Sequence, residues 1–125
     1  MKKILSLLLC FIVFLLFNGH AQQPIMDWFK LIGGNGHNVA LEMELDGVGN
    51  IYVVGSFTES LDFDPDSTTS HVLSSGGKKD GYILKLGPDG NLLWVKQIKG
   101  PGDNVVKSIY IDDYHNSYTT GYFSD

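Results

Sequence analysis

The sequence contains one cysteine, Cys10, and no arginine among its nine basic residues. A single cysteine cannot form an intrachain disulfide, so disulfide cross-links do not hold this chain together. Proteins that bind nucleic acid usually present a basic surface with arginine side chains. The formal net charge of −5 therefore argues against nucleic-acid binding, and it also disfavours adhesion to anionic membranes.

The sequence also lacks an apolar run long enough to span a membrane. Its longest, residues 4–17, has 14 residues with one serine, whereas a spanning helix needs about 20. Two lysines precede the run, and the small residues Gly19 and Ala21 follow it. This order predicts a secretory signal peptide over residues 1–21, cleaved after Ala21. The remaining region, 22–125, is then secreted or on the outer cell surface, with no membrane span.

Cleavage would change the composition of the chain. Cys10 and two lysines would leave with residues 1–21, so the mature region would have no cysteine, seven basic residues and 14 acidic ones, a net charge near −7. The position of Cys10 in the middle of the apolar run disfavours a lipidated cysteine. The acidic balance favours solubility and contact with cations.

An internal repeat is the main feature of the mature region. Residues 28–57 align without a gap on residues 94–123, with 12 identities over 30 positions at a constant offset of 66. Such a period indicates one supersecondary unit used again, as in a solenoid or a propeller. The identical positions are Trp28/Trp94, Lys30/Lys96, Ile32/Ile98, Gly34/Gly100, Gly36/Gly102, Asn38/Asn104, Val39/Val105, Asp46/Asp112, Asn50/Asn116, Tyr52/Tyr118, Gly55/Gly121 and Phe57/Phe123.

One unit is predicted to contain four short strands. Apolar residues alternate with acidic ones over 39–46, which is typical of a half-buried strand. Further strands are expected over 51–54, 81–86 and 92–98, separated by turns rich in Gly, Asn and Asp. No stretch of the mature region has helical periodicity. The predicted fold is all-β, with four-stranded antiparallel propeller blades.

Five segments of the mature region carry a family resemblance: Gly49–Phe57, Asp62–Pro65, Asp80–Leu86, Asp89–Asn91 and Trp94–Lys96. Together they resemble the bacterial β-propeller repeat of large secreted and cell-surface proteins, the type called the seven-bladed β-propeller repeat. The resemblance covers residues 27–125. It implies tandem four-stranded blades, export and often a C-terminal sorting or adhesive domain, and it brings no catalytic residue.

The period of 66 leaves room for about one full blade, residues 39–98, and parts of two others. We interpret Trp28–Ile32 as an outermost strand without its own blade. Because about three units are usually needed for stability, the chain is expected to be the N-terminal piece of a longer reading frame, truncated at its C-terminus. A small self-contained sandwich, which seven short strands could just supply, is the alternative that we disfavour.

Three carboxylates, Asp62, Asp64 and Asp66, occupy alternate positions in a predicted loop. Oxygen ligands at this spacing suit calcium, but the glycine and the distant glutamate of a calcium loop are missing. An acidic surface loop with Asx-type hydrogen bonds is the favoured interpretation. We therefore assign no metal, cofactor-binding or catalytic residue.

Other features are also interpreted as structural. The glycine-rich segments 34–38 and 100–104 do not open helices, so they are predicted to connect blades, with glycine supplying unusual backbone angles, and not to bind phosphate. No pair of histidines has zinc-binding spacing. Recurrence in both copies favours a packing role between sheets for the two tryptophans, for Tyr52 and Tyr118, and for Phe57 and Phe123.

The sequence predicts an exported, non-catalytic interaction or scaffold module of a larger surface or secreted protein, with a protein or a polysaccharide as partner. Two alternatives remain open. One is part of a secreted carbohydrate-active enzyme whose site lies in other blades. The other is a calcium-dependent glycan binder that uses the Asp62 loop.

Overall fold

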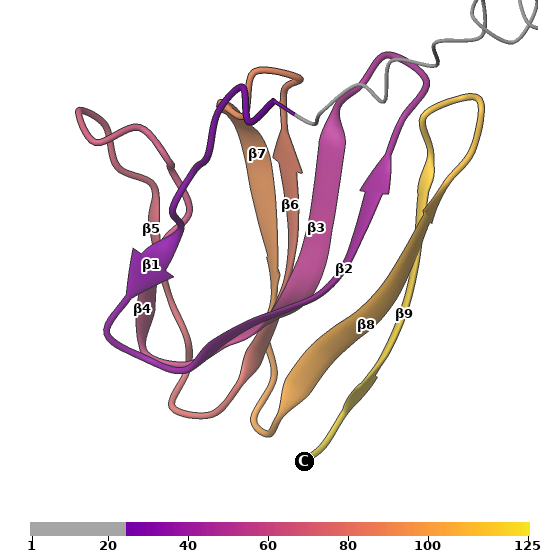
Figure 1. Cartoon of the computed structure of the whole chain (residues 1–125). Helices are drawn as coiled ribbons and strands as arrows, with labels where there is room; N and C mark the ends of the chain where they lie inside the picture. Colours follow the sequence, from indigo (N-terminus) through magenta and orange to yellow (C-terminus); the bar gives the residue numbers. More distant parts are fainter. Residues whose placement is uncertain (1–24) are drawn as a thin grey trace, which may run out of the picture.

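The computed structural model describes residues 25–125, so the predicted signal peptide lies outside the described residues. The described residues form nine strands and no helix, and thus no helix that could cross a membrane. Figure 1 shows the strands. They are β1 (Gly33–Gly34), β2 (Asn38–Leu45), β3 (Ile51–Phe57), β4 (Ser60–Asp62), β5 (Val72–Ser74), β6 (Asp80–Leu86), β7 (Leu92–Ile98), β8 (Asn104–Ile111) and β9 (Ser117–Phe123).

Strands β2, β3, β6 and β7 form one antiparallel sheet in that spatial order. Each strand lies beside the next one in the sheet, which is the arrangement of a propeller blade. This sheet, residues 38–98, is called unit 1, and the β8–β9 hairpin, residues 104–123, is called unit 2. The predicted all-β fold of propeller type is confirmed.

The β8–β9 hairpin repeats the β2–β3 hairpin residue for residue. Ala40 pairs with Gly55 in unit 1, and Val106 pairs with Gly121 in unit 2. Each hairpin has one β-bulge, which leaves Leu41 unpaired in β2 and its counterpart 66 positions later unpaired in β8. The offset of 66 found in the sequence is therefore also the offset of the backbone pairing.

A small second sheet was not predicted. β1, β4 and β5 pair in the order β1-β4-β5, and they pack on one side of unit 1. Phe63, which follows β4, lies edge-on to Phe57 at 5.3 Å and to Tyr82 at 5.0 Å between ring centroids. These aromatic rings and Leu61 form the larger buried core. Strands of two or three residues are too short for the alternation from which longer strands are recognised.

Residues Trp28–Ile32 do not form the predicted outermost strand, whereas Trp94 lies within β7. A strand needs a hydrogen-bonded neighbour, and no described strand lies beside this segment. Instead, the Trp28 ring packs over Gly90 in the β6–β7 turn, and Lys30 Nζ donates a hydrogen bond of 3.2 Å to Asn91 Oδ1. The segment is extended across the end of unit 1 (Figure 1).

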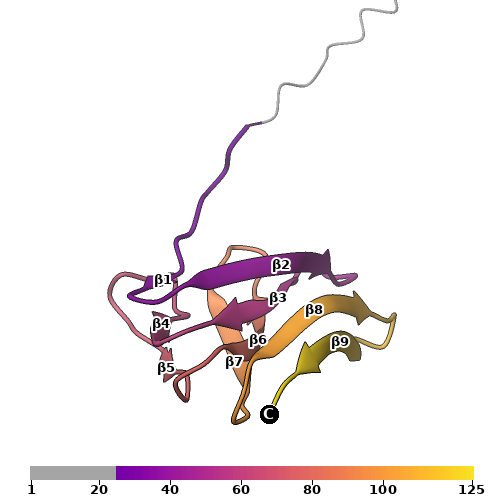
Figure 2. The ribbon, with the colours of Figure 1, turned by 90° about the horizontal axis from the view of Figure 1, so that it is seen from below.

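Unit 1 has two faces with different surroundings. Unit 2 lies against one of them (Figure 2), which we call the docked face, and there Tyr52 and Val54 are buried. The opposite face is called the open face, and the β1–β4–β5 sheet covers only part of it. Contrary to the prediction of a half-buried strand, Met43 and Leu45 of β2 are exposed on the open face. No described strand covers them.

Candidate functional site

The docked face is where two units of the repeat meet. Val106, Ile109 and Ile111 of β8 pack on Tyr52 and Val54 of β3, with Ile83 and Trp94 at the margin. Trp94 meets Tyr52 edge-on, with 6.0 Å between ring centroids. The predicted packing role is confirmed for Tyr52 and Trp94. Trp28, Tyr118 and Phe123 are 41%, 57% and 79% exposed, so none of the three packs between sheets in the described part of the chain, and the prediction was wrong for them.

Aspartate side chains close the turns of both hairpins. In unit 1, Asp46 Oδ1 accepts hydrogen bonds from the backbone N–H groups of Val48 at 3.1 Å and Asn50 at 2.9 Å. Asp46 Oδ2 accepts from Asn50 Nδ2 at 2.7 Å. This Asx-type closure satisfies turn donors that would otherwise need water.

The turn of unit 2 has the same network. Asp112 Oδ1 accepts from the N–H groups of Tyr114 at 2.9 Å and Asn116 at 2.8 Å, and Oδ2 accepts from Asn116 Nδ2 at 2.9 Å. His115 has φ of 64°, the counterpart of Gly49 with φ of 84°. The turn therefore keeps its left-handed residue even where the glycine is replaced.

Asp46 differs from Asp112 in its environment. Its side chain is fully buried, and Lys85 Nζ lies 3.4 Å and His115 Nδ1 3.5 Å from its Oδ2. Burial acts to raise the pKa of Asp46, but hydrogen bonds, first from Asn50, outweigh it and hold the pKa well below its usual value. Since His115 belongs to unit 2, this contact joins the two units.

A second polar contact also crosses between the units. Glu42 Oε2 of β2 accepts a hydrogen bond of 2.6 Å from the N–H of Ile109 in β8. Hydrogen bonds from Ser108 and from the Ile109 N–H lower the pKa of Glu42. The carboxylate thus links β2 of unit 1 to β8 of unit 2.

The glycine-rich segments are connections before β2 and β8, as predicted, but the reason for glycine is different. Gly36 and Gly102 do not have positive φ. A Cβ at Gly36 would collide with the carbonyl oxygen of Thr58, and a Cβ at Gly102 with that of Ser124. Close approach of the backbone, and not an unusual backbone angle, requires these glycines.

The acidic loop uses its carboxylates internally. Asp62 Oδ1 accepts from the N–H groups of Asp64 at 3.0 Å and His71 at 2.8 Å. Asp64 Oδ1 accepts from the Asp66 N–H at 3.0 Å, and Asp66 Oδ1 from the Thr68 N–H at 2.8 Å. The predicted Asx-type hydrogen bonds are confirmed. These bonds, first the one from His71 for Asp62 and the one from Thr68 for Asp66, lower the pKa of both carboxyls.

No group of three metal-ligating side chains occurs among residues 25–125. The buried carboxylate Asp80 also has a structural partner, because Gln97 Nε2 donates to its Oδ2 at 2.7 Å and to the Ser74 carbonyl at 2.9 Å. His37 and His71 are exposed and lie in separate loops. The Asp80 carboxylate and the Gln97 amide thus hold strands β6 and β7 to the end of β5.

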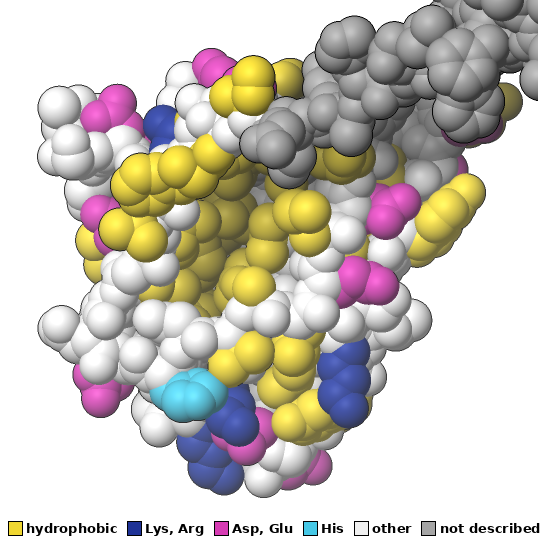
Figure 3. Space-filling view, viewed as in Figure 1, with side chains coloured by type: hydrophobic (Ala, Val, Ile, Leu, Met, Phe, Trp, Pro, Cys, Tyr) yellow, Lys and Arg dark blue, Asp and Glu magenta, His cyan; other side chains and the backbone are white. Residues whose placement is uncertain are grey.

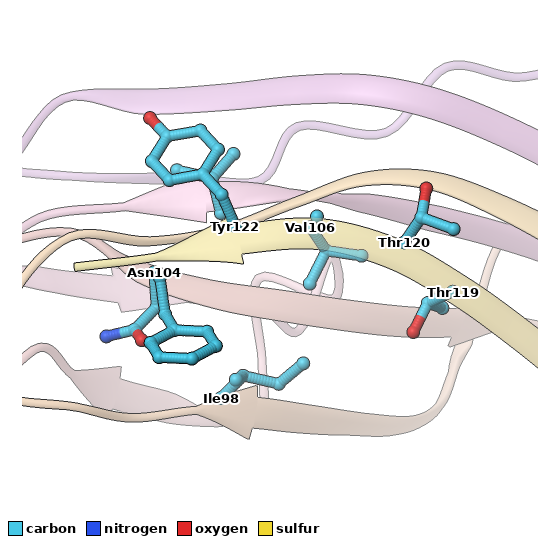
Figure 4. Close-up of a pocket in the computed structure, with 9 residues that line it drawn as sticks. Ile98, Asn104, Val106, Thr119, Thr120 and Tyr122 are labelled. Atoms are coloured by element: carbon cyan, nitrogen blue, oxygen red, sulfur yellow. The ribbon is translucent and has the colours of Figure 1, made fainter.

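A pocket lies at the same place of the repeat in unit 1 and in unit 2. The pocket of unit 1 has a volume of about 170 Å³ and that of unit 2 about 210 Å³. In Figure 4, Ile98 and Thr119 lie on one side of β9, whereas Thr120 and Tyr122 point to the other. Recurrence in both units favours a packing gap of the fold over a dedicated ligand site. The shared positions are Ile32/Ile98, Asn38/Asn104, Val39/Val105, Ala40/Val106 and Val53/Thr119.

Comparison with known proteins also indicates a repeat protein. The chain is similar to the uncharacterized WD repeat-containing protein L264 of Acanthamoeba polyphaga mimivirus, with 30% identity over 104 residues. The match covers 77% of this chain and 8% of that protein. No protein-family model and no solved structure matches the chain.

WD repeats build β-propellers from four-stranded blades of about 40–45 residues. The period here is 66, and the long connection from β3 to β6, residues 58–79, which contains β4 and β5, accounts for the extra length. The similarity and the sheet topology together support a repeat protein of β-propeller type.

Proposed function

We propose that this chain is an exported, non-catalytic interaction module of β-propeller type. The observation that carries the proposal is the docking of two copies of one repeat through a buried apolar face, with their polar side chains engaged in the turns. Such stacking makes a rigid scaffold whose loops and outer surfaces remain available to a partner. Fold alone does not define function, so the proposal is limited to scaffolding and binding.

We further propose that the partner is a protein or a polysaccharide at the cell surface and that the chain belongs to a larger protein of the bacterial secreted type. The basic start, apolar run and small-residue exit of residues 1–21 support export. The chain spans only 8% of the relative described above, whose name describes repeats and no reaction.

Two measurements test these statements. A fusion of residues 1–30 to a phosphatase that is active only outside the cytoplasm should give activity, and an inactive fusion would contradict export. The intact chain should bind members of a polysaccharide and surface-protein panel without releasing products. Turnover of any polysaccharide would overturn the non-catalytic assignment, and binding that disappears with a chelator would favour the calcium-dependent alternative.

A further inference from the structure

Equivalent residues of the two units differ sharply in exposure. Met43 and Leu45 of β2 are 61% and 57% exposed, whereas their counterparts Ile109 and Ile111 of β8 are 4% and 8% exposed. Figure 3 shows hydrophobic side chains gathered in a hollow between the β1–β4–β5 sheet and the four-stranded sheet, on the open face. The same position of the repeat is thus covered in unit 2 and uncovered in unit 1.

The surface that covers β8 is known from the docked face. It consists mainly of Tyr52 and Val54, whose counterparts in unit 2 are Tyr118 and Thr120 of β9. These counterparts are exposed, and Tyr118 lies beside Tyr110 with 6.3 Å between ring centroids. The chain therefore exposes both halves of an interface that it already forms once internally.

We propose that the open face of unit 1 binds the outer face of the β8–β9 hairpin of a second copy of this chain. In this contact Met43 of one copy would lie against Tyr118 and Thr120 of the other, as Ile109 lies against Tyr52 and Val54. Methionine sulfur packs favourably against aromatic rings. The inference rests on the proposed function as a module of stacking repeats, and it names a partner for that module.

The two sides of this contact are different surfaces, so the interface is heterologous. Repetition of a heterologous contact gives a ring if the rotation closes and a filament if it does not. In the internal interface, β8 packs on β2, β3 and β6 of unit 1. In the proposed contact, β2 of one copy takes the place of β8, and β8 and β9 of the other copy take the places of β2 and β3. Two of the three strands on which β8 packs therefore have a counterpart in the second copy.

The contact between copies should be weaker than the internal one. Ser108 occupies the position of Glu42, so the carboxylate that binds the Ile109 N–H has no counterpart. Gly49 occupies the position of His115, so the imidazole that reaches Asp46 is also missing. We expect reversible association that depends on concentration.

Site-specific cross-linking tests the geometry. In the chain carrying Cys10→Ser, an added cysteine is the only thiol. A mixture of the Met43→Cys and Thr120→Cys variants should give dimers with a short bismaleimide, and each variant alone should give few. Ser67→Cys in the exposed acidic loop, mixed with Thr120→Cys, is the control and should give few.

Sedimentation velocity tests the energetics. Met43→Asp should weaken association about tenfold, since the substitution puts a charge in place of buried apolar area. Leu93→Asp is the matched control, because Leu93 is also an exposed apolar strand residue, at 52%, but lies on the outer strand β7. It should leave association unchanged.

Three results would overturn the proposal. They are a monomer at every concentration measured, association that Met43→Asp leaves intact, and efficient cross-linking of Met43→Cys to itself, which would indicate a symmetric contact. None of them depends on export, glycan binding or turnover. Failure of the self-association is therefore distinguishable from failure of the proposed function.

Discussion

Replacing Asp46 by alanine should destabilise the protein far more than replacing Asp112, although both side chains close the same turn. The turn hydrogen bonds are common to both. The difference is that the Asp46 side chain is fully buried and that Lys85, with a side chain 15% exposed, has Asp46 as its counter-ion. Removing one partner of a buried charged pair leaves the other charge without a counter-ion. We therefore expect Asp46→Ala to lower the free energy of unfolding by about 3 kcal/mol.

Urea unfolding followed by tryptophan fluorescence measures this difference. In Asp112→Ala the freed N–H groups of the turn meet water, and the loss should be clearly smaller. A double-mutant cycle of Asp46→Ala with Lys85→Met should show coupling, because in the Lys85→Met variant the loss of Asp46 leaves no lysine without its counter-ion. Equal losses for the two aspartates, or no coupling with Lys85, would refute the reasoning that burial and not turn closure sets the cost.

Three further outcomes are expected. Gly55→Ala should cost about 2–3 kcal/mol in urea unfolding, because the Cβ would collide with the Val39 carbonyl oxygen, whereas Gly33→Ala, with open space around it, should change stability by less than about 0.5 kcal/mol. The pKa of Asp46 is lower in the folded chain than its unfolded value of 3.8. The stability that the ionised carboxylate contributes is therefore fully present above pH 3.8 and is lost as the pH falls below that value towards the folded pKa. The urea midpoint of Asp46→Asn should depend less steeply on pH in this acid range than that of the unsubstituted chain. Calorimetric titration with calcium should give no heat, because Oδ1 of every carboxylate in residues 62–66 already accepts a backbone N–H.

The parts of the fold that could be predicted are those encoded in local sequence. The turn that begins at Asp46 and ends at Asn50 contains its own hydrogen-bonding partners, so its recurrence at Asp112 predicted a second hairpin. The long strands followed from alternation and β-branched residues. Their bounds agree with the structure within a few residues.

The parts that could not be predicted depend on neighbours distant in the chain. The sequence of Trp28–Ile32 matches that of β7, but it forms no strand because no strand pairs with it. The β4–β5 excursion is stabilised by Leu61 and Phe63 against β6, a contact invisible in its own short strands. The cation beside Asp46 is contributed by Lys85, from a strand 39 positions later in the chain.

The interaction surface was missed for the same reason. Alternation in β2 correctly indicated an apolar side, but not whether anything covers it, and the answer differs between Met43 and its counterpart Ile109. The repeat allows burial to be compared at equivalent positions, because it places one backbone position in two environments. A position that is apolar in both copies and buried in one has a complementary surface elsewhere in the repeat. For Met43 that surface is the one that contains Tyr118, the counterpart of the Tyr52 that covers Ile109, which is why the open face should bind another unit before an unrelated partner.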